Sequence, residues 1–291
     1  MYPAPFEYHR PETADEAIQL LARYGDDAQL LAGGHSLIPL LKLRVSQPRY
    51  LIDVGRIQEL AGISKADGAL LIGATTTHAE IARSPLVRAS IPMLAEAAGL
   101  IGDPQVRNAG TIGGSLAHAD PGADLPAVML ALDAEITARS SLGDRTIPAR
   151  AFFVDLLTPA LTATEVLTRI RVPIPQAGAG GAYEKYPHPA SRYAVVGVAA
   201  VIGTRGDRVS HARVGVTGLG TRAVRASVVE DMLVGKTPDP ATIEAAAARV
   251  TDGIRLRSDL QGPEEYKAGL AHAFTRRALS RAAGLAASGR S

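Results

Sequence analysis

Two short glycine stretches, Ala32-Gly33-Gly34-His35-Ser36 and Thr111-Ile112-Gly113-Gly114-Ser115, decide how this sequence is interpreted. Each places a Gly-Gly pair close to a hydroxyl-bearing residue, and the first follows a short apolar run typical of a buried strand. Tandem glycines let backbone N–H groups approach an oxyanion with no Cβ in the way, and several such groups in a turn form an anion-binding nest. Two converging nests would suit a diphosphate.

The alternative interpretation is purely structural: each glycine pair is only a tight turn. Neither stretch matches the G-x-G-x-x-G or P-loop pattern, which disfavours a Rossmann site and a P-loop. If the nests are real, we expect positive φ angles at Gly33 and Gly114, and a branched side chain at either would block the diphosphate.

A polar segment, His118-Ala119-Asp120-Pro121-Gly122-Ala123-Asp124, follows the second glycine pair. His118, Asp120 and Asp124 could ligate a metal ion, but no second-histidine motif such as H-E-x-x-H accompanies them. Asp124 also precedes Leu125-Pro126, where an aspartate suits the N-cap of a helix with proline in its first turn. The helix cap is favoured over the metal site, and no metal is expected.

The composition is that of a globular protein without cysteine. Hydrophobic residues make up 46% of the 291 residues, and the formal net charge is +2. Without cysteine the chain can hold no disulfide, thiolate zinc site or cysteine-ligated iron–sulfur cluster. The balanced charge and the lack of tryptophan argue against binding of nucleic acid. No signal-peptide pattern and no run of 18 apolar residues occurs, so we expect a cytoplasmic protein with no transmembrane segment, at most peripheral to the inner membrane.

The first 130 residues mix helix and strand signals. Thr13 and Glu16 have capping-box spacing, an apolar helical face follows, and Gly25 is a stop signal. Asp67-Gly68 is a turn signal between two short strands. The periodicity predicts further strands at 28–32 and 50–54, and helices at 37–44, 86–102 and 124–132.

A proline- and glycine-rich stretch, Pro173 to Gly181, is the best domain boundary in the chain. Two β-prone stretches, 194–203 and 209–217, follow it and predict an antiparallel hairpin. The remaining sequence predicts helices at 226–234, 240–253 and 264–286. We therefore expect two domains, residues 1–176 and residues 177–291.

With the segment Asp-Pro-Gly-Ala-Asp-Leu-Pro-Ala at 120–127, the two glycine stretches resemble the FAD-binding medium subunits of molybdenum hydroxylases, the xanthine dehydrogenase family. Within that family the sequence is most similar to the medium subunits of aerobic carbon monoxide dehydrogenases. The resemblance runs from residue 3 to about residue 280. It implies an α+β fold: a two-lobed FAD-binding domain of the vanillyl-alcohol-oxidase (PCMH) type, with lobes of about 1–55 and 56–176, and a C-terminal domain of antiparallel sheet and helices.

The resemblance also implies a set of cofactor-binding residues and no catalytic residue. By position, the two glycine stretches would hold the FAD diphosphate, and Asp124 would bind the ribityl or phosphate side. Leu167 would touch the ring system, Lys185 would approach its pyrimidine end, and Tyr193 would lie against the isoalloxazine. Ser115 stands where the family often has asparagine. The full set is Ala32, Gly33, Gly34, His35, Ser36, Leu37, Gly110, Thr111, Ile112, Gly113, Gly114, Ser115, Ala117, Asp120, Asp124, Leu167, Lys185 and Tyr193.

The resemblance implies an oxidoreductase subunit that binds FAD non-covalently and works in electron transfer. In the family, a large subunit carries the molybdenum cofactor and a small subunit carries the [2Fe-2S] clusters. A chain without cysteine would receive electrons from such a partner onto FAD and pass them to an external acceptor: quinone, oxygen or NAD. We expect a dimer of heterotrimers, with Arg276, Arg277 and Arg281 able to pair with acidic groups of a partner.

Two other functions stay open at this point. The chain could be a stand-alone FAD-dependent oxidase or reductase of the same fold, or a cofactor-free scaffold whose glycine stretches are only turns. The sequence leaves the substrate of the molybdenum subunit undetermined.

Overall fold

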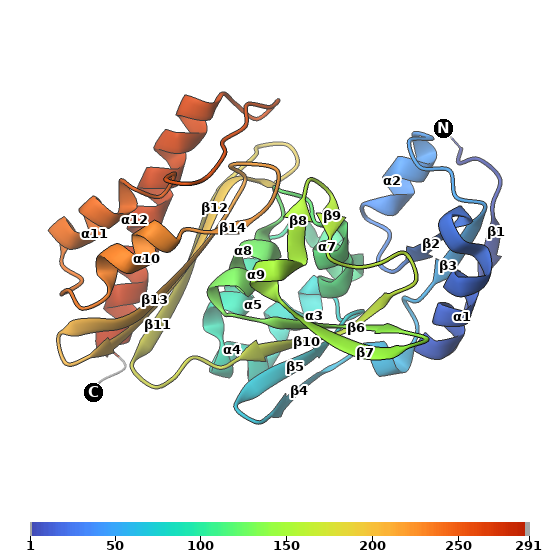
Figure 1. Cartoon of the computed structure of the whole chain (residues 1–291), viewed down its shortest axis with the longest axis horizontal. Coiled ribbons are helices and arrows are strands. Elements are labelled where there is room, and N and C mark those ends of the chain that lie inside the picture. Colours follow the sequence, from blue (N-terminus) through green and yellow to red (C-terminus); the bar gives the residue numbers. More distant parts are fainter. Residues whose placement is uncertain (1, 289–291) are drawn as a thin grey trace.

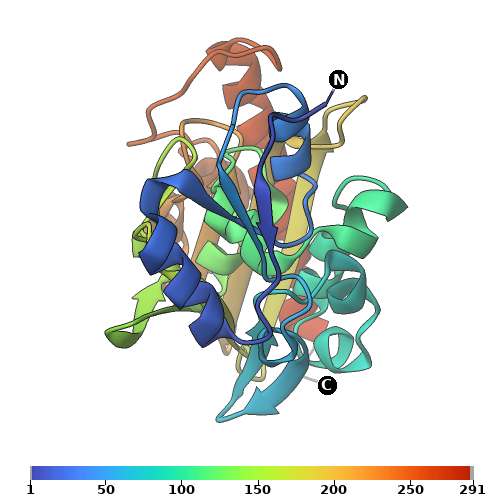
Figure 2. The same cartoon turned by 90° about the vertical axis from the view of Figure 1, so that its right-hand side faces the viewer.

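The structure, a computed structural model, describes residues 2–288, and its three main sheets follow one another along the chain (Figures 1 and 2). The first sheet is parallel, with the order β1-β3-β2. Parallel neighbours need crossover connections, and a helix supplies one of them here. The elements of this part are β1 (Glu7–His9), α1 (Ala14–Tyr24), η1 (Gly25–Asp27), β2 (Ala28–Leu31), α2 (Leu37–Lys42), β3 (Tyr50–Asp53) and η2 (Gln58–Leu60).

Helix α1 begins where the sequence predicts. The Thr13 side chain accepts a hydrogen bond from the N–H of Glu16, and the helix ends at Gly25, whose φ is +55°. The capping box itself is incomplete, because the Glu16 carboxylate accepts from the N–H of Glu12 rather than from Thr13. The buried face of α1 includes Ile18 and Leu21 and packs on the first sheet.

The second sheet is antiparallel, with the order β4-β5-β10-β6-β7. The predicted turn at Asp67 and Gly68 is confirmed, and both residues have positive φ angles, as a two-residue hairpin of this kind requires. The strands are β4 (Ile63–Ala66), β5 (Ala69–Gly73), β6 (Glu135–Ser140), β7 (Gly143–Pro148) and β10 (Val166–Pro173).

Seven helices and a short two-stranded ribbon accompany the second sheet in the described chain. The single helix predicted over 86–102 is wrong: it is two helices with a break before Pro92, because proline lacks the N–H and restricts the preceding residue, Ile91, to non-helical angles. The elements are α3 (His78–Arg83), α4 (Pro85–Ser90), α5 (Pro92–Gly99), α6 (Pro104–Ala109), α7 (Ile112–His118), α8 (Asp124–Ala131), α9 (Ala149–Phe152), β8 (Phe153–Asp155) and β9 (Thr158–Pro159).

The third sheet, β11-β12-β13-β14, is antiparallel and lies between α12 on one face and α8 on the other (Figure 1). The packing is close enough that a Cβ on Gly215 of β13 would overlap the carbonyl oxygen of Ala127 in α8. The predicted hairpin and final helix are confirmed. The elements are β11 (Ala179–Pro187), β12 (Ala194–Arg205), β13 (Arg208–Thr217), β14 (Val224–Arg225), α10 (Ser227–Leu233), α11 (Pro240–Ala247) and α12 (Glu264–Ser288).

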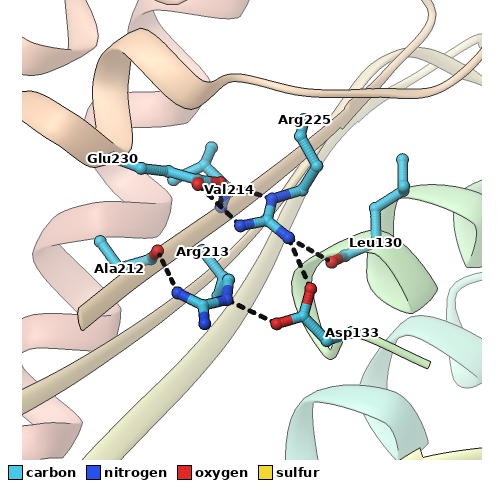
Figure 3. A network of polar contacts seen from close by, with 7 residues as sticks. All are labelled: Leu130, Asp133, Ala212, Arg213, Val214, Arg225 and Glu230. Atoms are coloured by element: carbon cyan, nitrogen blue, oxygen red, sulfur yellow. Dashed lines mark hydrogen bonds and ion pairs between the residues drawn. The ribbon is translucent and has the colours of Figure 1, made fainter. Parts of the chain in front are cut away.

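A network of ion pairs fixes the third sheet to the end of α8 (Figure 3). Asp133 accepts from Arg213 at 2.5 Å and from Arg225 at 2.7 Å, and Arg225 also reaches the carbonyl of Leu130. The guanidinium of Arg225 forms a two-pronged pair with the carboxylate of Glu230 in α10. The network thus joins two sheet strands, α10 and α8.

The arginines of α12 are engaged within the chain. Arg281 pairs with Glu96 and Glu184, Arg276 pairs with Glu244, and Arg277 lies over the ring of Phe274. Arg276 and Arg277 nevertheless remain exposed, so the pairing of these arginines with acidic groups of a partner stays a prediction.

The α+β class is confirmed by the arrangement of the sheets, with a parallel and an antiparallel sheet in the N-terminal half and a C-terminal unit of antiparallel sheet and helices. The predicted boundary at 176/177 falls in the link between β10 and β11, and the domain limits stay a prediction. Residue 1 and residues 289–291 of those domains lie outside the described residues. Within residues 2–288, no helix combines the length and apolar character needed to cross a membrane.

Candidate functional site

A cavity of about 580 Å³ lies where segments from all three sheets meet. The residues predicted to bind the cofactor line this cavity, except Ile112 and Lys185. Other walls come from the N-terminal part, from the 157–167 segment around β9, and from the 191–193 loop that precedes β12. The structure therefore brings together segments that are far apart in the sequence.

The first glycine stretch directly follows β2 and forms an open turn. Gly34 has φ = +74°, a conformation that favours glycine, whereas Gly33 does not have a positive φ. No hydrogen bond among residues 2–288 uses the backbone N–H groups of residues 33–37. These N–H groups can therefore bind an oxyanion at the cavity wall, as the sequence predicts for a nest.

The second glycine stretch has a different geometry. Thr111 is the N-cap of α7, and its side chain accepts from the N–H of Gly114 at 3.0 Å. The N–H groups of Ile112, Gly113 and Ser115 donate to carbonyls of Thr76, Ala74 and Thr111. The prediction of a second open nest is wrong, because all four N–H groups already have protein acceptors. Gly114 also lacks a positive φ, and the Ile112 side chain is fully buried in the core.

Asp124 is the first residue of α8, and its side chain does not cap the helix. Its carboxylate accepts from the Tyr183 hydroxyl at 2.6 Å and lies 2.9 Å from the Lys185 ammonium group. Burial raises the pKa of Asp124, and Lys185 opposes that shift. Burial and the nearby Asp124 also raise the pKa of the Tyr183 hydroxyl well above its usual value. The predicted N-cap role is replaced by a buried charge pair at the cavity wall.

Lys185 lies behind the wall rather than on it. Its side chain is 4% exposed, and its ammonium group donates to Asp124 and to the carbonyl of Leu100 at 3.0 Å. Lys185 therefore reaches the cavity through Asp124, and its approach to the pyrimidine end of the ring stays a prediction. Leu167, nearly buried, and Tyr193, which is 37% exposed, both line the cavity as predicted.

The metal alternative finds no support in the described part of the chain. His118 and Asp120 are 4.0 Å apart, and Asp120 accepts a hydrogen bond from the N–H of Gly122. No group of three or more histidine, aspartate or glutamate side chains within residues 2–288 is arranged to hold a metal ion.

Sequence reasoning missed the residues that hold the acidic loop in place. Thr217, at the end of β13, donates from its hydroxyl to the carbonyls of Pro121 and Ala123 at 2.6 and 3.0 Å. The N–H groups of Gly218 and Ala194 add bonds to the same loop. No local sequence signal marks Thr217, since a threonine that ends a strand is ordinary.

A second missed feature is the ion pair beneath the 157–167 wall. Glu165 accepts two hydrogen bonds from the Arg145 guanidinium, at 2.5 and 2.8 Å, and one from the N–H of Thr162. The Arg145 guanidinium lowers the pKa of Glu165 to about 2. The pair fixes the segment that leads into Leu167.

The residues present fit a dinucleotide cofactor. An oxyanion can reach the open N–H groups of residues 33–37, and an elongated ligand can run from there toward Asp124 and Leu167. A Cβ on Gly33 would overlap the carbonyl oxygen of Ala109 and lie 2.8 Å from the Gly110 Cα, so the absence of a side chain lets the two walls meet here.

Comparison with known families identifies the class of protein that this fold and site define. Residues 4–175 match the family described as the FAD binding domain in molybdopterin dehydrogenase. Residues 181–282 match the CO dehydrogenase flavoprotein C-terminal domain. The chain belongs to this family of FAD-binding molybdopterin dehydrogenase subunits.

Individual relatives match nearly the whole chain. It is 43% identical over 282 residues to the carbon monoxide dehydrogenase medium chain of Hydrogenophaga pseudoflava, covering 97% of this chain and 98% of that one. It is 38% identical to the 6-hydroxypseudooxynicotine dehydrogenase complex subunit alpha of Paenarthrobacter nicotinovorans, with coverages of 97% and 96%.

Solved structures agree with this relationship. Carbon monoxide dehydrogenase from Hydrogenophaga pseudoflava contains a chain with a TM-score of 0.94 and 44% identity, covering 97% of this chain and 98% of that one. Quinoline 2-oxidoreductase from Pseudomonas putida 86 gives a TM-score of 0.93 at 37% identity, with coverages of 98% and 99%. The resemblance in the sequence is confirmed, and the chain is an oxidoreductase subunit of the FAD-binding type.

Proposed function

We propose that the chain is the flavoprotein subunit of a molybdenum hydroxylase, most closely of the aerobic carbon monoxide dehydrogenase type. It would accept electrons from iron–sulfur clusters of a partner subunit onto FAD and pass them to an external acceptor. One observation carries the proposal: a dinucleotide-sized cavity with open N–H groups at residues 33–37 lies in a chain that has no cysteine for clusters of its own.

The residues of this chain would bind and orient the cofactor. The open N–H groups of the first glycine stretch hold the diphosphate, and Asp124 hydrogen-bonds the ribityl side while Tyr183 and Lys185 keep its carboxylate in position. Leu167 gives an apolar wall for the ring, and Tyr193 covers the ring where the cavity meets solvent. FAD, when bound, supplies the one- and two-electron chemistry, and the protein supplies its position and electrostatic environment.

The partners follow from the missing cluster ligands. A flavin that handles electrons from a molybdenum centre needs a cluster-bearing chain beside it, so an iron–sulfur subunit and a molybdenum subunit would complete the enzyme. The relatives named as a medium chain and as a subunit of a dehydrogenase complex support this arrangement. We propose a dimer of heterotrimers as the assembled form, with the FAD held non-covalently.

Affinity purification of the tagged chain from its own host tests the proposal. We expect two further chains in stoichiometric amounts, flavin and [2Fe-2S] absorption bands, and molybdenum in the preparation. Adding the substrate should bleach the flavin band only in the assembled preparation. Recovery of a flavoprotein alone that oxidises an organic substrate would establish the stand-alone oxidase or reductase instead. A colourless chain that binds no FAD would establish the scaffold.

A further inference from the structure

His78 is a buried histidine that faces the cavity. It is the first residue of α3, and its backbone N–H donates to the carbonyl of Gly110 at 3.0 Å. The residue is only 4% exposed, yet it lines the cavity wall. Its Nδ1 atom is buried and has no hydrogen-bond partner within residues 2–288. The Nδ1 side of the ring is therefore closed off within the protein, and the Nε2 edge is the part of the ring that can serve a ligand in the cavity.

The ring orientation is set by its neighbours. A Cβ built on Gly110 would lie 3.0 Å from Cδ2 and 3.1 Å from Nε2 of His78, so this edge of the ring faces Gly110. Gly33 of the first glycine stretch packs against the same place, since its own Cβ would lie 2.8 Å from the Gly110 Cα. The Nε2 edge therefore lies where the two walls of the cavity converge beside the open N–H groups.

The protonation of the ring follows from burial. Burial, aided by an electrostatic contribution from the neighbouring His35, lowers the pKa of His78 to about 4, so the His78 ring is neutral at physiological pH. A neutral imidazole carries one N–H. Because Nδ1 is enclosed with no acceptor in reach, we assign the proton to Nε2 and leave Nδ1 as a bare lone pair. His78 is then a neutral donor whose N–H points to the convergence of the walls.

We propose that His78 donates a hydrogen bond from Nε2 to an oxygen of the FAD diphosphate, next to the open N–H groups of residues 33–37. This inference rests on the proposed function and adds a side-chain donor to a site that otherwise uses backbone N–H groups. A donor at this position would form a hydrogen bond with FAD and ADP, which carry a diphosphate, and would not contribute to the binding of FMN.

Titration of the apoprotein variants tests the assignment. His78→Leu keeps an apolar side chain of moderate size in the buried position and removes the donor, whereas His78→Gln keeps an N–H donor. We expect the dissociation constants of both FAD and ADP to rise about tenfold in His78→Leu, with that of FMN unchanged, and to recover in His78→Gln. Thr275→Val is the matched control: it removes the hydroxyl of another buried, unpartnered side chain, in α12, and should leave FAD and ADP binding unchanged.

A measurement on the unaltered protein guards against variants that fail to fold. Imidazole ¹⁵N spectra of the native apoprotein should show the Nε2–H form of His78, and ADP alone should shift that resonance. An unchanged resonance, or an FAD affinity that falls in His78→Leu while the ADP affinity stays constant, would overturn the His78 assignment while the native chain still binds FAD. A native chain that binds neither FAD nor ADP would overturn the proposed function together with it.

Discussion

The Lys185 ammonium group lies 2.9 Å from the Asp124 carboxylate, and both side chains are 4% exposed. Lys185 comes from β11 of the third sheet, whereas Asp124 starts α8 at the cavity wall. The third sheet therefore supports the wall of the cavity from behind. A carboxylate buried in this way needs its counter-ion, since a lone buried charge is strongly unfavourable.

Lys185→Met should cost about 3–5 kcal/mol of unfolding free energy, because it leaves the buried Asp124 carboxylate without its counter-ion. Urea unfolding of the apoprotein measures the cost. Asp124→Asn/Lys185→Met is the control, and the double variant should lose less than the sum of the two single losses. A cost below about 1 kcal/mol in the single variant would mean that Lys185 is not the counter-ion.

Gly33→Val should abolish FAD binding and also reduce stability. The added side chain would overlap the carbonyl of Ala109, so the two cavity walls must move apart, at a cost of about 1–3 kcal/mol. This clash, rather than a positive φ, is why glycine is needed at position 33. Fluorescence titration with FAD and far-ultraviolet circular dichroism report the two effects.

Gly269→Ala provides the matched control for that substitution. Gly269 lies inside α12 with open space around its Cα, so alanine should leave FAD binding unchanged and raise helix stability by up to about 1 kcal/mol. If Gly33→Val retained native FAD affinity, the first glycine stretch would be only a turn.

The isolated chain should bind FAD much more tightly than FMN and release it intact on acid precipitation. The open N–H groups of residues 33–37 suit a diphosphate, and the adenosine half fills cavity volume that FMN leaves empty. Isothermal titration compares the two flavins, and the absorbance of the supernatant after precipitation reports release. Flavin that stays in the pellet would indicate a covalent bond. Equal affinities for FAD and FMN would mean that the protein does not recognise the diphosphate.

The parts of the site that could be predicted are those that short local sequence patterns mark. The Gly-Gly stretches and the acidic segment stand out in the sequence because glycine and aspartate at close spacing are unusual inside regular elements. The nest geometry was predicted correctly for the first glycine stretch and wrongly for the second. Whether a Gly-Gly pair forms an open turn or the first turn of a helix depends on where carbonyls such as those of Ala74 and Thr76 lie.

The contacts that support the site could not be predicted. Lys185 and Asp124 are 61 residues apart, and Thr217 holds a carbonyl 94 residues earlier in the chain. Such pairs depend on the packing of the third sheet against α8, which no periodicity of either segment encodes. The broken helix at Pro92 was readable in principle, since proline restricts the residue before it.

The apoprotein should lose stability as the pH falls from about 6.5 to 4. The His78 pKa is about 4 in the fold against 6.5 in the unfolded chain, so over this range the unfolded state binds a proton that the native state does not. The loss of unfolding free energy caused by His78 reaches about 3 kcal/mol at pH 4 and vanishes above pH 6.5. His78→Leu should flatten this part of the profile of melting temperature against pH. An unaltered profile in that variant would assign the titration to another group.

Arg225→Met should destabilise the protein more than Asp133→Asn, although both belong to the network in Figure 3. Arg225 is the two-pronged partner of Glu230, and both side chains are largely buried, so its loss leaves Glu230 with the N–H of Val214 alone. We expect a cost of about 2–3 kcal/mol.

Asp133 is half exposed and sits at the edge of the same network, so the cost of Asp133→Asn should stay below about 1 kcal/mol. Salt separates the two variants further. At 1 M salt the Debye length falls to about 3 Å, so the Asp133→Asn cost should nearly vanish, while the Arg225→Met cost persists because the Glu230 carboxylate stays desolvated. Urea unfolding at low and high salt measures both. If both variants lost the same unfolding free energy, and high salt abolished both losses, the network would be a surface feature that does not stabilise the packing of the third sheet on α8.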